Sequence, residues 1–561
     1  MKAIKILLPL FCLTFIIYSL TLCPTVSLID SGEFITASKF LNILHPTGYP
    51  LYTLLIRITA LLPFGELVGR VNLLSAFFSS LSVIFFFLFL FRHQRDLPTS
   101  LLVTSLYAFS TILWSVSNEA EVYSLTALFL TSLLYLLSRI EERNIIFLTA
   151  FLFGLSLTNH MMLTSLLLPL LLLLLPLRKR EAIIIFLFFL FGLSLYLFLP
   201  IRASLSPLIN WGNPKDLTRF LWHITGKQYR VWMFNLSFPE LLRNCQQSIS
   251  SLARDTLFFF FPLSLFGILL SFRRNRKWSL FSLLLLGLSF LYAVNYTIPD
   301  IEPYYLPSFV SLLFFLSFTL KELKEKLRLV LGSVYLLLLP LPLIFNFSSN
   351  QKRDYYLAED FARNAFVSAP ESSLILTNWW DFYAPSLYLQ HVRGERKDLC
   401  LIDKELLRRF WYYEYLKKVY PWLLENSKEE LASFLSYLVQ FESGRLKDTF
   451  GIQKSFIQYL RSLRDKNPER HFFLLFLPTF DYDLPGILEG RKIIPRGILF
   501  EITDDTIPKP FNYQSLTLRL PKKRLEERER LIINYYHLLA RERLRYKRDE
   551  GLEEWLNKTR F

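Results

Sequence analysis

Long runs of apolar residues alternate with short polar segments over the first 345 positions of the chain. After a first apolar run near the N-terminus, such runs follow at 71–91, 98–116, 122–138, 144–158, 160–176, 181–200, 255–272, 278–296, 304–320 and 328–345. A helix needs about 20 mainly apolar residues to cross a bilayer. The pattern therefore predicts a polytopic α-helical membrane protein with about 11 spans.

Two apolar runs need separate interpretation. The first, in MKAIKILLPLFCLTFIIYSLTLC, follows a basic start and lacks the small residues of a signal-peptide cleavage site. We expect it to be an uncleaved span with a cytoplasmic N-terminus. The run at 51–62 is interrupted by Arg57 and is too short to cross comfortably, so it predicts an interfacial or re-entrant helix inside a first outer loop at 23–69.

Basic and acidic segments separate onto opposite sides of the predicted membrane. The loops expected inside contain RHQRD, SRIEERN, LRKRE, RRNRK and KELKEKLR, each with at least two basic residues. The loops expected outside contain DSGEF, SNEAEVY, LTNH, IRASLSPLINWGNP (in a long outer loop at 201–254) and NYTIPDIEPYY. This distribution predicts that residues 1–348 form a transmembrane domain and that the following residues lie outside.

The last part of the chain, residues 349–561, has a different pattern. Its apolar runs shorten to strand length, and SSLILTNWWDFYAPSLYLQHVRGERKDLCLID predicts a strand, a helix and a second strand. From Lys522 onward, Ile532, Tyr536, Leu539 and Tyr546 recur at helical spacing among interleaved charges, which predicts a solvated or membrane-surface helix. We expect a soluble, extracytoplasmic α/β domain with a C-terminal helix.

Composition agrees with the membrane class. Hydrophobic residues make up 52% of the chain, and the mean hydropathy is +0.33. The net charge of +16 comes largely from basic clusters between the apolar runs, which indicates membrane topology and argues against nucleic-acid binding. The four cysteines are scattered and form no CxxC pair, so neither a zinc site nor a disulfide framework is expected.

The stretch LIDSGEFITASKFLNILHPTGYPLY brings polar chemistry into the first outer loop. Asp30 and Glu33 have the spacing of a capping box at the start of a helix. Phe34, Ala37, Leu41 and Leu44 would form one apolar face, which predicts a helix lying on the membrane surface. A capping role explains how the helix begins, but it does not explain why further carboxylates gather on the same side.

Those further groups are both acidic and basic. Glu119 and Glu121 precede one predicted span, Asp300 and Glu302 precede another, and possible partners are Arg202, His45, His160, His223, Lys227 and Arg230. Ionisable groups at the edge of a helical bundle are either functional or paired. A carboxylate beside cations suits transfer from a phosphorylated lipid, because the carboxylate takes the acceptor's proton and the cations stabilise the departing phosphate. Structural alternatives remain for single residues, such as an interface anchor for Arg202 or a hydrogen-bonded bundle residue for His160.

The order of motifs resembles a known family. DSGEF, HPTGYPLY, AEVYSL, LTNH, LPIRA, INWGNP, HITGKQY and IPDIEPYYLP together resemble a polytopic family of the GT-C superfamily, whose animal member is a protein O-mannosyltransferase of receptor ectodomains. The resemblance covers roughly residues 1–350, and the segment WDFYAPSLYLQHVRGERKDLCLIDKELL is similar to bacterial relatives. Thr47 stands where relatives usually carry a second proline.

The resemblance implies a glycosyltransferase that uses a polyprenyl-phosphate sugar, carries a first-loop carboxylate as general base and inverts the anomeric carbon. Asp30 is the first candidate for the base and Glu33 the second, and no metal or other cofactor is expected. The donor and its phosphate would be bound by Arg202, His45, Tyr49, His160 and Lys227. Further site candidates are Glu119, Glu121, Tyr123, Asn159, His223, Asp300, Glu302 and Tyr305.

Two other functions stay open. A lipid or glycan transporter or flippase would need polar residues at mid-depth and a repeated half, whereas stretches such as LLLPLLLLLLP are uninterrupted. A non-catalytic scaffold for envelope glycans would need only the outer domain. For the enzyme, the expected partners are a polyprenyl-phosphate sugar, membrane lipid and an acceptor protein or surface glycan, at the bacterial inner membrane.

Overall fold

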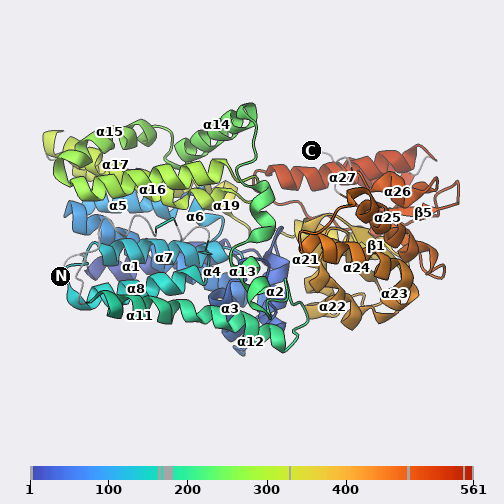
Figure 1. Ribbon diagram of the computed structural model, residues 1–561. Coiled ribbons are helices and arrows are strands. Elements are labelled where there is room, and N and C mark those ends of the chain that lie inside the picture. The colour runs from blue at the N-terminus through green and yellow to red at the C-terminus, as the bar shows by residue number, and fades with distance from the viewer. Residues whose placement is uncertain are drawn as a thin grey trace. The chain divides into compact units, whose positions relative to one another are not determined.

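The computed structural model describes residues 4–161, 166–167, 181–327, 330–476, 481–546 and 550–558. The chain divides into two compact units, each assembled from separate stretches (Figure 1). The helical unit comprises Met1–Pro24, Ile43–Ser204 and Pro214–Arg353, and the sheet unit comprises Thr25–Asn42, Leu205–Asn213 and Asp354–Phe561. Two segments expected in the outer loops of the membrane domain, around Asp30 and around Trp211, thus group with the C-terminal part of the chain.

The described residues of the helical unit form helices joined by short connections. They are α1 (Ile4–Leu20), α3 (Pro50–Ala60), α4 (Leu67–Gln94), α5 (Leu97–Ala108), α6 (Thr111–Trp114), α7 (Val122–Leu137), α8 (Arg143–Leu157), α11 (Ala182–Leu193), η1 (Ser194–Leu197), α12 (Phe198–Ser204), α13 (Leu217–Ile224), η2 (Lys227–Trp232), α14 (Phe238–Asp255), α15 (Phe260–Arg274), α16 (Arg276–Val294), η3 (Glu302–Tyr305), α17 (Leu306–Leu327), α18 (Val330–Leu338) and α19 (Leu341–Asn350). Local sequence explains individual boundaries. The helix α5, for example, begins after Asp96, whose side chain accepts a hydrogen bond from the Thr99 N–H at 3.1 Å.

Membrane crossing is supported by the length and hydropathy of several of these helices. Among the described residues, five helices are long and apolar enough to span: Leu67–Gln94, Ala182–Ser204, Arg276–Val294, Glu302–Lys326 and Ser333–Asn350. A sixth arises if the bent pair α14 and α15 counts as one span, and α1, α3, α5, α7 and α8 are shorter apolar helices. The chain is thus a largely helical membrane protein, but the predicted count of about 11 spans is not confirmed. The predicted span at 160–176 falls mostly outside the described residues.

Close helix pairs organise the helical unit. The helices α4 and α7, α8 and α11, and α15 and α17 pack against each other. Small residues permit this approach: a Cβ atom at Gly154 would stand 2.1 Å from the Phe189 carbonyl oxygen, and one at Gly192 would stand 2.2 Å from that of Phe151. Small residues at such interfaces are typical of helices that associate within membranes.

Among its described residues, the sheet unit contains a five-stranded sheet in the order β2-β1-β3-β5-β4. The central strand β1 (Leu374–Thr377) pairs in parallel with β2 (Cys400–Asp403) and β3 (Phe472–Leu475), and β5 (Leu499–Thr503) pairs antiparallel with β3 and β4 (Lys492–Arg496). Its helices are α2 (Ser31–Phe40), α20 (Leu357–Ser368), α21 (Trp380–Leu387), η4 (Tyr388–Arg393), η5 (Leu406–Arg408), α22 (Phe410–Val419), α23 (Pro421–Asn426), α24 (Lys428–Glu442), α25 (Thr449–Asp465), α26 (Leu484–Leu488), η6 (Tyr513–Ser515), α27 (Glu527–Leu544) and α28 (Glu550–Lys558). The predicted strand, helix and strand correspond to β1, α21 and β2.

The C-terminal helix α27 differs from the prediction in its surroundings. Ile532, Tyr536 and Leu539 are buried, and the helix packs against β4 and α28. Its apolar residues therefore complete the core of the sheet unit, so the expectation of a solvated or membrane-surface helix was wrong for that face.

Candidate functional site

The first-loop carboxylates lie on the helix α2 of the sheet unit. Asp30 occupies the N-cap position, but its side chain makes no capping hydrogen bond to the helix, so the predicted capping box is wrong. The physical reason is its backbone, which is helical (φ −94°, ψ −10°), whereas a capping residue usually has an extended conformation. Instead, Oδ1 of Asp30 accepts a hydrogen bond from Nε1 of Trp380 at 2.8 Å.

Most of α2 is enclosed, and only its last turn, with Lys39, reaches the surface. Every residue from Ser31 to Ser38 is buried, and the helix ends at Phe40, so Leu41 lies beyond it at the C-cap with a left-handed backbone. The helix packs against α21 at Gly32, where an added Cβ would stand 2.2 Å from the carbonyl oxygen of Ala384. The prediction of a membrane-surface helix was therefore wrong, because a glycine lets two helices of this unit meet backbone to backbone.

Glu33 faces a cavity with aromatic walls. Its side chain is only 2% exposed and lines the cavity together with Ile209, Trp211, Trp380, Tyr383, Leu387, Leu406, Trp411, Tyr412 and Tyr415. The rings of Trp211 and Trp411 stack with centroids 4.6 Å apart, and Trp211 meets Trp380 edge to face at 5.8 Å. Ligand pockets are lined mainly by aromatic and apolar side chains with a few polar groups, and the lining of this cavity has that chemistry.

Hydrogen bonds tie this wall to the sheet. The Tyr383 and Tyr412 hydroxyls are 2.7 Å apart, and the Tyr412 oxygen accepts the Asp403 backbone N–H at 3.1 Å. The Asp403 carboxylate accepts the Leu406 N–H at 2.9 Å, while burial raises the pKa of Asp403 to about 7. The aromatic residues are therefore held at the carboxyl end of β2, an edge of parallel sheets where ligands often bind.

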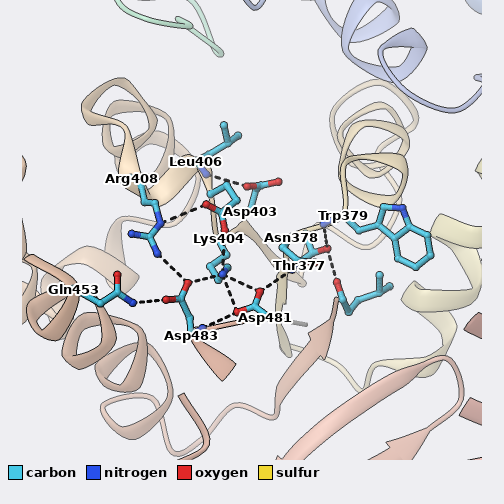
Figure 2. A network of polar contacts seen from close by, with 12 residues as sticks. Thr377, Asn378, Trp379, Asp403, Lys404, Leu406, Arg408, Gln453, Asp481 and Asp483 are labelled. Carbon is cyan, nitrogen blue, oxygen red and sulfur yellow. Dashed lines mark hydrogen bonds and ion pairs between the residues drawn. The ribbon is translucent and has the colours of Figure 1, made fainter. Parts of the chain in front are cut away.

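A second polar network lies at the ends of β1 and β2 (Figure 2). Lys404 Nζ contacts Asp481 at 2.9 Å and Asp483 at 2.5 Å, and Arg408 contacts Asp483 at 2.9 Å. Asn378, directly after β1, donates to Asp481 at 2.8 Å. These charges satisfy one another, so the network joins the strand ends and the following helices as a structural element.

The helical unit gathers a second set of predicted residues. The Tyr49 hydroxyl lies 3.0 Å from Nε2 of His45, and the Tyr49 ring stacks on His160 with centroids 5.8 Å apart. The Tyr123 ring packs at 5.3 Å from His160, and its hydroxyl donates to Asp300 at 3.1 Å. This histidine and tyrosine cluster thus connects the turn after Ile43 with the segment before α17.

His223 lies against the same turn. Its ring is 3% exposed, and neither ring nitrogen has a hydrogen-bond partner among the residues that the structure describes. A Cβ atom at Gly48, where φ is +87°, would stand 2.8 Å from Nε2 of His223. Burial, followed by the charge of His45, lowers the pKa of His223 from 6.5 to about 3, so the ring is neutral at physiological pH.

The remaining predicted residues lie elsewhere in the helical unit. Glu119 pairs with Lys352 at 2.6 Å, and Asn159 donates to the Val122 carbonyl and to Thr126. Glu121 lies at the start of α7, and Glu302 lies at the start of η3. Arg202 lies in the last turn of α12 near Arg57, and Lys227 lies over the Trp222 ring at 3.4 Å. Tyr305 lies beside the Ser248 hydroxyl.

Some residues of the cavity wall and of the histidine and tyrosine cluster were not among the predicted site residues. Tyr304, not Tyr305, reaches the histidine cluster, with its hydroxyl 3.4 Å from Nε2 of His160. Trp211, Trp380 and Trp411 line the cavity beside Glu33. Trp211 and Trp380 stood inside quoted motifs, INWGNP and the NWWDFYAP segment, so tryptophan within a motif was the available signal.

The chain is similar to known proteins in sequence. Residues 30–184 match the family described as Protein O-mannosyl-transferase TMEM260 N-terminal domain. A Mus musculus protein named Protein O-mannosyl-transferase TMEM260 is 28% identical over 447 residues, which cover 72% of this chain and 63% of that protein. A Dictyostelium discoideum protein of the same name is 23% identical over 465 residues, covering 71% of this chain and 57% of that protein. The chain therefore spans less than two thirds of these relatives. The predicted resemblance to a family of O-mannosyltransferase-like membrane proteins is confirmed by the family match over residues 30–184 and by the similarity to both relatives.

Proposed function

We propose that this chain is a GT-C type glycosyltransferase that moves a hexose, mannose in the first instance, from a polyprenyl-phosphate donor to an acceptor hydroxyl. The observation that carries the proposal is the first-loop pair of carboxylates, Glu33 against a wall of tryptophans and Asp30 bonded to Trp380. Carboxylates beside aromatic rings suit a sugar substrate. The relatives named protein O-mannosyl-transferases support mannose and a protein acceptor.

The proposed reaction is a single displacement. Asp30, with Glu33 as the second candidate, takes the proton of the acceptor hydroxyl while the oxygen of that hydroxyl forms a bond to the anomeric carbon. The bond from that carbon to the donor phosphate oxygen breaks, polyprenyl phosphate leaves, and the anomeric configuration inverts. Arg202, Lys227, His45, His160 and the Tyr49 hydroxyl are the groups proposed to bind the donor phosphate.

The proposed setting is the extracytoplasmic side of a bacterial plasma membrane. About 11 spans, a cytoplasmic N-terminus and an external sheet unit would put the first-loop carboxylates where a lipid-linked donor meets a water-borne acceptor. The sheet unit would then shape the acceptor site, because it contributes both α2 and the tryptophan wall. A surface glycan is the alternative acceptor.

The test is transfer of labelled mannose from polyprenyl-phosphate-mannose by purified chain, with released polyprenyl phosphate measured in parallel. Asp30→Asn should lower the rate roughly 10²–10⁴-fold, the usual contribution of a general base. Glu33→Gln tests the second candidate, and Glu430→Gln, on α24 of the same unit, is the matched control. If Asp30→Asn and Glu33→Gln both keep full transfer while unfolding at the control's temperature, the mechanism is wrong. A transporter or scaffold would release no polyprenyl phosphate.

A further inference from the structure

The helix α14 in the helical unit has three distinct faces. One is buried against its neighbours: the Asn244 side chain donates to the Val294 carbonyl at 3.2 Å, Ser248 contacts the Tyr305 hydroxyl, and Leu252 is buried. The helix begins with a capping box in which Glu240 accepts the Ser237 backbone N–H at 2.8 Å. It is therefore a well-defined helix that uses only one face for internal packing.

The exposed surface of α14 is divided between an apolar and a polar stripe. Phe238, Leu242 and Ile249 are 77%, 60% and 46% exposed and recur at intervals of four and seven residues. At about 100° per residue these side chains fall on one side, whereas Arg243, Gln247 and Arg254 fall on the opposite side. Such a division is typical of helices that lie in a membrane interface.

The orientation of α14 agrees with that interpretation. It meets α15 at a bend of 94°. The helix α15 packs along α17, which makes up most of the candidate span Glu302–Lys326 (Figure 1). If α15 follows the direction of that span, then α14 runs roughly parallel to the membrane plane. A helix with this direction can rest its apolar stripe in the boundary between lipid tails and head groups.

The loop before α14 adds exposed aromatic residues at the same level. Val231, Trp232 and Phe234 are 66%, 48% and 66% exposed. The Phe234 N–H donates to the Asn295 carbonyl at 2.8 Å, and the Thr297 N–H donates to the Trp232 carbonyl at 3.0 Å. These bonds fix the loop at the end of α16, another candidate span, where tryptophan and other aromatic residues are enriched in membrane proteins.

Basic side chains accompany this apolar surface. Lys227 and Arg230 are exposed, and within the described part of the chain neither forms an ion pair. Lys227 lies over the ring of Trp222 at 3.4 Å, an arrangement that keeps its ammonium group beside an aromatic face. Arg243 adds a third cation on α14. Cations beside interfacial apolar residues complement the phosphates of anionic phospholipids.

We propose that residues 227–254 form a lipid-binding surface that lies in the head-group layer of the bilayer and prefers anionic phospholipids. The apolar stripe of α14 and the 231–234 loop enter the acyl boundary, and Lys227, Arg230 and Arg243 contact lipid phosphates. The surface belongs to the helical unit alone. Its apolar stripe, Arg230 and Arg243 take no part in the proposed transfer reaction, whereas Lys227 is shared with the proposed donor-phosphate site.

The position of the surface can be tested by photocrosslinking in vesicles that contain radiolabelled phospholipid. In the full-length chain, benzoylphenylalanine would replace Phe234, Phe238 or, as the matched control on the polar stripe of the same helix, Gln247. Crosslinking to lipid should be at least about fivefold stronger at 234 and 238 than at 247, because only the apolar stripe enters the bilayer. Equal labelling at 238 and 247, or labelling of neither, would overturn the proposal.

The preference for anionic lipid is tested with Phe238 labelled in vesicles holding equal amounts of phosphatidylglycerol and phosphatidylcholine. With the three cations present, crosslinking to phosphatidylglycerol should be about threefold stronger than crosslinking to phosphatidylcholine. A triple variant that combines Lys227→Gln, Arg230→Gln and Arg243→Gln should show no preference. The control removes three exposed cations of the sheet unit, by Lys428→Gln, Arg445→Gln and Lys454→Gln, and should leave the preference unchanged. No preference in the starting chain, or its loss in the control, would contradict anionic selectivity.

Discussion

The indole of Trp380 donates its N–H to Oδ1 of Asp30, and this contact links the proposed base to a residue of α21. Trp380→Phe keeps an aromatic ring but removes the donor, so the carboxylate loses one group that fixes its orientation. Because hydrogen bonds to charged groups contribute about 1.5–3 kcal/mol, kcat for mannose transfer should fall roughly tenfold or more. Trp422→Phe, in α23, is the control and should keep the original kcat. An unchanged kcat in Trp380→Phe would show that this contact does not assist the reaction.

His223 offers a test of buried histidine chemistry. Its pKa is lowered from 6.5 to about 3, so the folded chain binds fewer protons than the unfolded chain between these values. Stability is therefore complete above pH 6.5 and decreases as the pH falls toward 3, by about 2 kcal/mol at pH 5 from this group. In His223→Phe, the decrease in melting temperature between pH 7.5 and pH 5 should be smaller than in the original chain. His537→Phe, in α27, is the control; an unchanged pH dependence in His223→Phe would contradict the prediction.

The sequence identified individual polar residues more readily than their partners. Asp30, Glu33, His45 and His160 were chosen because ionisable groups at the edge of a helical bundle are either functional or paired. Tyr49 was added by the family resemblance. The contact of Asp30 with Trp380 joins positions 350 residues apart, and no local pattern indicates such a pairing. Position within a motif could suggest Trp380, but only the fold brings the two side chains together.

The helix α2 depends on a close approach to α21. A Cβ atom at Gly32 would stand 2.2 Å from the Ala384 carbonyl oxygen and 2.4 Å from its carbon, and backbone atoms cannot move aside as a side chain can. Gly32→Ala should therefore force α2 away from α21, lower stability by about 1–3 kcal/mol and reduce transfer activity. Gly287→Ala, in α16 with nothing within 4 Å of the added methyl group, is the matched control. A melting temperature in Gly32→Ala equal to that of Gly287→Ala would show that the two helices are not held this closely.

Elements with a strong periodic pattern were predicted well, and those set by tertiary packing were not. The run SSLILTN forms β1 and DLCLID forms β2, because short apolar runs between turn residues have few alternatives. The residues of α2 form the predicted helix, but its apolar positions suggested a membrane surface. Gly32 and the backbone of Ala384 determine instead that this helix packs inside a protein unit.

At the scale of the whole molecule, hydropathy separates the chain near residue 350, whereas the contacts divide it differently. Thr25–Asn42 and Leu205–Asn213 belong to the sheet unit although they lie between apolar runs. Long-range packing of loop segments leaves no mark in a hydropathy pattern, which records only neighbouring residues. Hydropathy also does not determine the number of membrane spans. Several apolar helices are shorter than the membrane is thick, so whether they cross it depends on how they pack with other helices.

The helix α2 belongs to the sheet unit, so removal of the C-terminal part of the chain should destabilise it. Removing residues 354–561 would leave α2 without α21 and would remove the Asp381 carboxylate that accepts the Ile29 N–H at 3.0 Å. It would also remove the Val392 carbonyl, to which Lys39 donates at 2.9 Å in the last turn of α2. Isolated helices of about ten residues are marginal in water, so a chain ending at Arg353 should be cut by trypsin after Lys39 much faster than the full chain. Cleavage within 273–277, between α15 and α16, serves as the internal control and should proceed at the same rate in both proteins. Equal protection at Lys39 would contradict the dependence of α2 on the rest of the sheet unit.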